Sequence, residues 1–305
     1  MIKKLVVIIL PIMLITSSTT VTPQSKNKGI EKIYYLIVGN SYYDQNMLFE
    51  DTPFENLQGA KRSAELIETY IKENSKSEGI ILLSKKNNLL KRETFFTALE
   101  NIIKKIENDK ANSLLIVYFC GHGVTDGIGW NLFLIPGAFR GNKKELTTSI
   151  ETFAQKAIYV MDIYKVLEKV KFPHIVMLDT CYEGEESKLT PMIFSEALQE
   201  NLTNISNIVR YMNQFHTDSA FLFSTKPGSY VPMVENPKYP SSVYNVGPLA
   251  RRFALVFEKF KRSRVNMTYG DLIRHMISND LDSKTKPALT YVEKSFFNMN
   301  IFTFD

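Results

Sequence analysis

Two short stretches of the sequence hold the residue types of a thiol-dependent reaction. The segment YFCGHGVTDG (118–127) places His122, one of only four histidines, between two glycines. The segment HIVMLDTCYEGE (174–185) carries Cys181, one of only two cysteines, at the end of an apolar run. A cysteine attacks as its thiolate, so it needs a histidine close enough to take the proton or to hold it as an ion pair. The two stretches therefore predict a Cys-His pair for nucleophilic catalysis.

Each candidate residue follows a run that is typical of a strand buried on both faces. The run SLLIVYFC (113–120) comes just before His122, and HIVMLDT (174–180) comes just before Cys181. Neighbouring parallel strands lie roughly 5 Å apart, and such sheets bind ligands at the carboxyl ends of their strands. If the two runs are neighbours, the loops after them bring the imidazole and the thiol together at one edge.

The backbone beside His122 offers a second catalytic element. Glycine on either side leaves the chain uncrowded, so a substrate carbonyl can approach the amide of Gly123. Together with the amide of Cys181, this group would form an oxyanion hole, in which one donor is typically worth about 3 kcal/mol.

Alternating strand and helix signals place these residues in an α/β fold. Apolar runs predict strands at residues 32–40, 79–84, 113–120, 174–180 and 219–225, with shorter candidates near 131–137 and 298–304. Apolar spacings of three and four predict helices within 57–71, 95–106, 160–170 and 248–260, and Thr268 with Asp271 predicts a capping box for one more. This alternation implies right-handed crossovers and a mostly parallel sheet with helices on both faces.

Composition limits the class of protein and its partners. The chain has 305 residues, of which 44% are hydrophobic and 23% are charged, as expected of one large globular domain. Its formal net charge of +5 includes Lys3 and Lys4 of the first segment, and a chain without them carries about +3. This charge is too small to indicate nucleic acid as a partner, and no nucleic-acid motif accompanies it.

The first residues read as a secretory signal. Two lysines precede an apolar segment from Leu5 to Ile15, and small polar residues follow. About 11 apolar residues are too few for a membrane span of roughly 20, although an uncleaved anchor stays an alternative. We expect a signal peptide over 1–22, a linker over 23–31 and one domain over 32–305. The mature protein is then secreted or periplasmic, with no stable membrane insertion.

Other interpretations of the cysteines and histidines stay open at the level of sequence. Cys120 and Cys181 would end two adjacent strands, and an even pair in an oxidising compartment can form a disulfide. The other histidines have no spacing typical of metal ligands, so we expect ordinary core or surface residues and neither a metal nor another cofactor. They are His174, His216 and His275.

The two catalytic stretches resemble a known family. The His-Gly and Asp-x-Cys blocks of the caspase-like cysteine peptidases are similar to LLIVYFCGHG and HIVMLDTCYEG. This family includes metacaspases, legumains, gingipains and the catalytic subunit of GPI transamidase. YYLIVGNSYYD followed by LQGAKRSAELI resembles the opening strand and first helix of the caspase and metacaspase branch. The resemblance implies a three-layer sandwich around a mostly parallel six-stranded sheet, with a peptide or protein as the substrate.

The resemblance also implies roles for individual residues. Cys181 would be the nucleophile of an endopeptidase and His122 its acid and base, with the oxyanion at the amides of Gly123 and Cys181. Asp179 matches the metacaspase acid of the first specificity pocket, which favours Arg or Lys before the cut bond; alternatively, it orders the loop after its strand. Relatives place further substrate-binding residues at positions matched here by Asn40, Asp44, Ser224 and Thr225.

Some features depart from the family or leave its chemistry open. The chain lacks the Gln-Ala-Cys of caspases, and it reads DTCYEG where metacaspases have a Ser-Gly after their His. Tyr182 and Glu183 therefore leave the substrate preference open. A cut after Lys188, in the polar segment behind the nucleophile, would mature the enzyme; the alternative is a long active-site loop. A pseudoenzyme that binds a partner, or a transamidase that resolves the thioester with an amine, are the competing functions.

Overall fold

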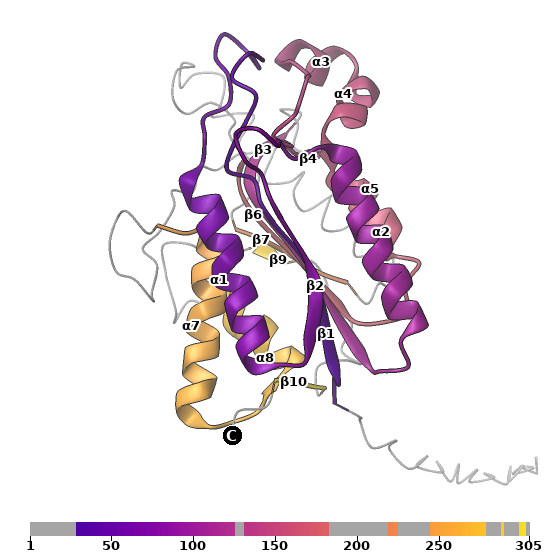
Figure 1. Cartoon of the computed structure of the whole chain (residues 1–305), viewed down its shortest axis with the longest axis vertical. Coiled ribbons are helices and arrows are strands. Elements are labelled where there is room, and N and C mark those ends of the chain that lie inside the picture. The colour runs from indigo at the N-terminus through magenta and orange to yellow at the C-terminus, as the bar shows by residue number, and fades with distance from the viewer. Residues whose placement is uncertain are drawn as a thin grey trace, which may run out of the picture.

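A computed structural model describes residues 29–125, 131–182, 219–224, 245–278, 288–289 and 299–302. The expected signal peptide (1–22), most of the expected linker (23–31) and the Lys188 cleavage site lie outside the described residues. Within this part of the chain, the fold is a sheet with helices packed on both faces (Figure 1).

The central sheet is mostly parallel, as predicted. Its main path runs in the order β2-β1-β3-β6-β7-β9, and only the last pair on that path is antiparallel. The strands of this path are β2 (Ser77–Leu83), β1 (Lys32–Gly39), β3 (Ser113–Thr125), β6 (His174–Tyr182), β7 (Ser219–Phe223) and β9 (Ala288–Leu289). Parallel neighbours need crossover connections, and helices along the chain supply them.

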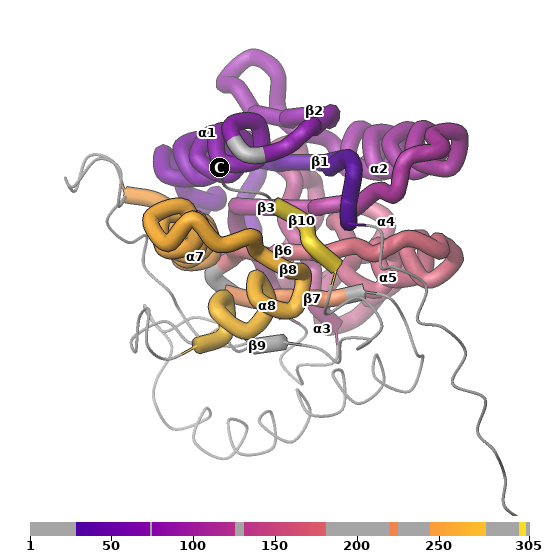
Figure 2. The backbone as a smooth tube through the Cα atoms, turned by 90° about the horizontal axis from the view of Figure 1, so that it is seen from below, coloured from indigo at the N-terminus to yellow at the C-terminus, as the bar shows by residue number. Residues whose placement is uncertain are grey.

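The helices form a layer on each side of the sheet (Figure 2). One face is covered by α1 (Gln58–Asn74), α7 (Pro248–Ser263) and α8 (Tyr269–Ile277), and the other by α2 (Arg92–Asn108) and α5 (Val160–Leu167). The predicted capping box at Thr268 and Asp271 is confirmed at the start of α8. Among the described helices, none is both long enough and apolar enough to cross a bilayer.

Strand alternation divides the apolar residues of β3 between the two faces. Tyr118 and Cys120 pack into the cluster beneath α1 and α7, whereas Val117 and Phe119 pack into the cluster beneath α2 and α5. This explains why the run reads as continuously apolar, since both sides of the strand are buried.

The end of β3 differs from the prediction. The sequence indicated that the strand stops at Cys120 because Gly-His-Gly follows, but β3 continues to Thr125. The continuation is possible because β4 (Leu132–Leu134) pairs with it antiparallel, which confirms the predicted hairpin edge near 131–137. In the same way β6 continues through Tyr182 alongside β3.

Short elements that the sequence did not indicate lie between β4 and α5. They are α3 (Lys143–Thr148), α4 (Ile150–Lys156) and β5 (Ile158–Tyr159), and they lie near the carboxyl ends of the strands (Figure 1). The predicted last strand is present as β10 (Asn300–Phe302), which pairs with β8 (Met267–Thr268) in a separate two-stranded sheet.

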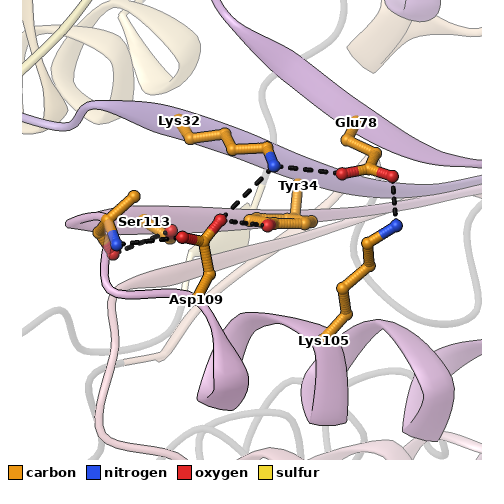
Figure 3. A network of polar contacts seen from close by, with 7 residues as sticks. Lys32, Tyr34, Glu78, Lys105, Asp109 and Ser113 are labelled. Atoms are coloured by element: carbon orange, nitrogen blue, oxygen red, sulfur yellow. Dashed lines mark hydrogen bonds and ion pairs between the residues drawn. The ribbon is translucent and has the colours of Figure 1, made fainter.

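A polar network ties the strands together at their amino ends (Figure 3). Lys32 of β1 lies 3.0 Å from a carboxylate oxygen of Glu78 and 3.3 Å from one of Asp109, and Glu78 also pairs with Lys105 of α2. Hydrogen bonds from Tyr34 and the Ala111 amide lower the pKa of Asp109 to about 2. These partly exposed pairs link β1, β2 and α2 at the end of the sheet opposite to His122.

Candidate active site

His122 and Cys181 are direct partners in the ladder between β3 and β6. We expected them on loops beyond the strands, but both lie within the strands, because β3 and β6 continue to pair past Cys120 and Thr180. The structure describes Cys181 by its backbone only. The ladder nevertheless brings the two positions together at the carboxyl edge of the sheet, side by side on adjacent strands.

The imidazole of His122 is buried and has a fixed partner on one nitrogen. Its side chain is 2% exposed, and Nε2 lies 2.8 Å from the backbone carbonyl oxygen of Glu55. A carbonyl oxygen can only accept, so Nε2 must carry the hydrogen. The nitrogen left to take up and release a proton is therefore Nδ1.

Tyr43 holds His122 from the backbone side. The amide of His122 donates to the Tyr43 hydroxyl at 2.7 Å, and the two rings lie 4.8 Å apart. The Phe54 ring lies 5.2 Å from the same imidazole. Neither Tyr43, Phe54 nor the Glu55 carbonyl was found from the sequence.

One glycine of the Gly-His-Gly segment is explained by Tyr43. A Cβ atom at Gly121 would lie 2.9 Å from the Tyr43 hydroxyl and 2.9 Å from the Phe119 ring, closer than real Cβ contacts come. The bare backbone beside His122 is thus required by a close approach within the protein. Gly121 was the one sequence signal that something packs tightly at this point.

The two expected oxyanion donors are the amides of Gly123 on β3 and Cys181 on β6. Gly123 is paired with Leu134 of β4 on one side and with Tyr182 of β6 on the other. The amide of Cys181 belongs to the residue that precedes Tyr182 on β6. The two expected donors are therefore on adjacent strands at the same edge as His122.

The carboxylate of Asp179 is directed into the protein, against the first turn of α7. Its Oδ2 accepts from the Tyr118 hydroxyl at 2.9 Å and from the Ala250 amide at 3.1 Å. A Cβ at Gly247 would lie 2.1 Å from that oxygen, so the glycine makes room for the carboxylate. Burial raises the pKa of Asp179 to about 6, although the hydrogen bonds from Ala250 and Tyr118 lower it.

Three of the other four expected substrate-binding residues are described, and each is held by an intramolecular contact. Asn40 is buried, and its side-chain amide donates to the Ile135 carbonyl at 2.7 Å. Asp44 pairs with Arg140 at 2.8 Å. The Ser224 hydroxyl donates to the Thr180 carbonyl at 3.0 Å, and Thr225 lies outside the described residues.

The disulfide interpretation is wrong. Cys120 is a buried thiol and not half of a disulfide. Its ladder partner on β6 is Asp179, which puts Cys181 two residues further along. Strand geometry then gives a Cα separation of roughly 8 Å, beyond the range in which a disulfide closes.

Two of the other histidines are described. His174 is fully buried, and its Nδ1 lies 2.9 Å from the Phe172 carbonyl oxygen. His275 packs its ring against Phe260, and His216 lies outside the described residues. Within the described ranges no group of three or more His, Cys, Asp or Glu side chains could hold a metal ion.

Comparisons with known proteins support the fold and identify a family. The family model described as Caspase domain matches residues 34–289. Among solved structures, protein GSU0716 from Geobacter sulfurreducens is similar with a TM-score of 0.53 at 11% identity, over 89% of this chain and 98% of that one. Caspase-1 from Spodoptera frugiperda is similar with a TM-score of 0.50 at 11% identity, over 91% of each chain. No curated protein sequence matches the chain significantly.

Proposed function

The chain belongs to the caspase-domain family, and from that premise we propose that it is a cysteine endopeptidase with Cys181 as nucleophile and His122 as acid and base. The observation that carries the proposal is the pairing of His122 with Cys181 in the β3–β6 ladder. Residues paired directly in a parallel ladder share a face of the sheet, so both positions belong to one face. A nucleophile and its base must come within hydrogen-bond reach of each other, and this shared face supports the proposal.

The reaction starts with a proton transfer between the two residues. The Cys181 thiol gives its proton to Nδ1 of His122, while the Glu55 carbonyl keeps the hydrogen on Nε2 and so orients the imidazolium. The thiolate then attacks the carbonyl carbon of the substrate, which forms a carbon–sulfur bond and a tetrahedral oxyanion. The amides of Gly123 and Cys181 are proposed to bind that oxyanion.

Collapse of the intermediate and hydrolysis complete the cycle. His122 returns its proton to the leaving amine as the peptide bond breaks, and a thioester remains on Cys181. Water then attacks the thioester carbon, and Nδ1 takes one proton from that water. The new carboxylic acid leaves as the proton returns to the cysteine sulfur.

A preference for Arg or Lys before the cut bond is a further part of the proposal. It rests on Asp179, two residues before the nucleophile. One carboxylate oxygen of Asp179 is committed to Tyr118 and Ala250, whereas Oδ1 has no hydrogen-bond partner among the described residues. Oδ1 is therefore the atom that would accept from a basic side chain. Equal cleavage after Asn, Asp, Arg and Lys would remove this part and leave the dyad untouched.

The decisive experiment compares the wild type with two cysteine variants. Fluorogenic peptides with Arg, Lys, Asn or Asp before the cut bond are incubated with wild type, Cys181→Ala and Cys120→Ala. We expect Cys181→Ala to lose turnover, and Cys120→Ala, which removes the other thiol, to retain it. A peptidyl chloromethyl ketone should add one label to the Cys181 peptide in mass spectrometry. Turnover by Cys181→Ala equal to that of wild type would refute the proposal, as would an inert and unlabelled wild type.

A further inference from the structure

The loop between β1 and α1 contacts His122 at three points. The Glu55 carbonyl oxygen lies 2.8 Å from Nε2, the Tyr43 hydroxyl accepts from the His122 amide at 2.7 Å, and the Phe54 ring lies 5.2 Å from the imidazole. The ring and the backbone of the histidine are thus both held by this one loop.

The loop is closed on itself by two amide side chains. Asn56 accepts from the Tyr43 amide through Oδ1 at 3.0 Å. Gln45 donates to the carbonyl oxygens of Tyr43 at 3.1 Å and Phe54 at 3.0 Å. These bonds join the start of the loop, which carries Tyr43, to its end, which carries the Glu55 carbonyl. The two groups that hold His122 are therefore fixed relative to each other.

An aromatic cluster anchors the closed loop. Phe54 packs 4.9 Å from Phe49 and 6.2 Å from Phe139, and Phe139 lies 5.1 Å from Phe153 of α4. The short α3–α4 segment thereby supports the loop from outside. Tyr43 is 4% exposed and belongs to the same cluster, whereas Asn56 is exposed.

We propose that Tyr43 and Asn56 are positioning residues of the peptidase: Asn56 closes the loop so that the Tyr43 hydroxyl and the Glu55 carbonyl hold His122 in one orientation, with the hydrogen on Nε2. The inference rests on the proposed function, because it assigns a catalytic task to His122. In this role neither residue needs to touch the substrate. Both act by keeping Nδ1 directed to the reaction, where a displacement of about 1 Å can cost up to 100-fold in rate.

The test uses matched variants of the full chain. Tyr43→Phe removes one hydroxyl, Asn56→Ala removes the closing acceptor, and Asn56→Asp keeps an acceptor at that place. Tyr35→Phe is the control, because Tyr35 is as buried as Tyr43 and its hydroxyl donates to Glu68 on α1, away from His122. We expect kcat to fall between about fivefold and 100-fold in Tyr43→Phe and Asn56→Ala, with KM within about twofold. Asn56→Asp and Tyr35→Phe should stay near wild type.

A second measurement does not depend on turnover. In Cys181→Ala protein labelled with ¹⁵N-histidine, the His122 nitrogens should report a protonated Nε2 and an unprotonated Nδ1 when the ring is neutral. Adding Asn56→Ala or Tyr43→Phe should shift these signals toward a mixture of the two tautomers. Adding Tyr35→Phe should leave them unchanged.

The outcomes separate this inference from the proposed function. If wild type is active through Cys181 and both Asn56→Ala and Tyr43→Phe keep its kcat, the positioning role is wrong and the peptidase stands. If wild type is inert and is not labelled at Cys181, the peptidase is wrong, and unchanged His122 signals in the ¹⁵N experiment would overturn the loop's hold on the imidazole as well. Because Asn56 is exposed, Asn56→Ala carries the test if Tyr43→Phe fails to fold.

Discussion

His122 and Cys181 are paired residues of two neighbouring parallel strands, and β4 pairs with β3 from Gly123 onward, directly after His122. A slip of one residue in this ladder would put the two positions on opposite faces of the sheet. The proposed chemistry therefore depends on the register of the central strands and on the orientation of a single imidazole.

Replacing His122 by Gln should lower kcat/KM by about 10² to 10⁴, because a positioned acid and base contributes that much to a reaction. The measurement is hydrolysis of the best fluorogenic peptide at several pH values. His275→Gln is the matched control, since His275 lies on α8 and packs against Phe260. A His122→Gln protein within tenfold of wild type would show that another group does the proton transfer.

Gly121→Ala should destabilise the protein by about 1 to 3 kcal/mol, because the new methyl group would overlap the Tyr43 hydroxyl and the Phe119 ring. Urea unfolding measures the loss. Combining it with Tyr43→Phe removes one of the two overlapping atoms, so the double variant should be more stable than the sum of the single effects by at least about 0.5 kcal/mol. Strict additivity would mean that the hydroxyl does not occupy the space beside position 121.

The long elements of the fold could be predicted from their apolar residues. The long buried strands are apolar on both faces, and the long helices carry one regular apolar stripe. The run at 113–120 and the stripe at 95–106 are of this kind, and they match β3 and α2. The segment from Lys143 to Tyr159 could not be predicted. Its helices span only one to two turns, and an element of that length is stabilised by tertiary contacts such as those of Phe153 rather than by its own periodicity.

The same distinction applies to the candidate site. His122 and Cys181 could be found because their side chains are rare in this sequence and chemically specific. The Glu55 carbonyl could not be found, because every residue has a carbonyl group and only the conformation of the loop selects this one. The extension of β3 beyond Cys120 was missed for a similar reason, since glycines read as a break unless a partner strand such as β4 is known.

The stability of Asp179→Asn relative to that of the wild type should be higher at neutral pH than at pH 4. The folded protein raises the pKa of this carboxyl from an ordinary 3.8 to about 6. Between these values the folded state binds a proton that the unfolded state does not, so this group's contribution to stability falls as pH rises through that range, by roughly 3 kcal/mol in total. Asparagine does not titrate, and its oxygen can still accept from Tyr118.

The check is the free energy of urea unfolding of both proteins at pH 4 and pH 7.5. The free energy of unfolding of the variant minus that of the wild type should increase as pH rises. Titratable groups that both proteins share cancel in this difference. A difference that is constant with pH would mean that Asp179 ionises in the folded protein as it does in the unfolded chain.

His174→Asn should have the opposite effect on the acid side. Burial lowers the pKa of His174 from 6.5 to about 4, although the hydrogen bond with the Phe172 carbonyl raises it. As pH falls from about 6.5 to about 4, the unfolded chain takes up a proton that the folded protein refuses, so stability is lost by roughly 3 kcal/mol. Asparagine keeps a donor for the Phe172 carbonyl and does not titrate, so the stability of the variant should rise relative to that of the wild type as the pH falls through this range.

Because His174 and Asp179 act in opposite directions between about pH 4 and pH 6, their contributions nearly cancel in the wild type. Each single variant should therefore reveal the slope of the residue that remains. Asp179→Asn should lose stability steeply on acidification, and His174→Asn should gain it, when both are followed by urea unfolding at half-unit steps of pH. If both variants followed the wild-type curve in parallel, neither buried group would control the acid stability of the protein.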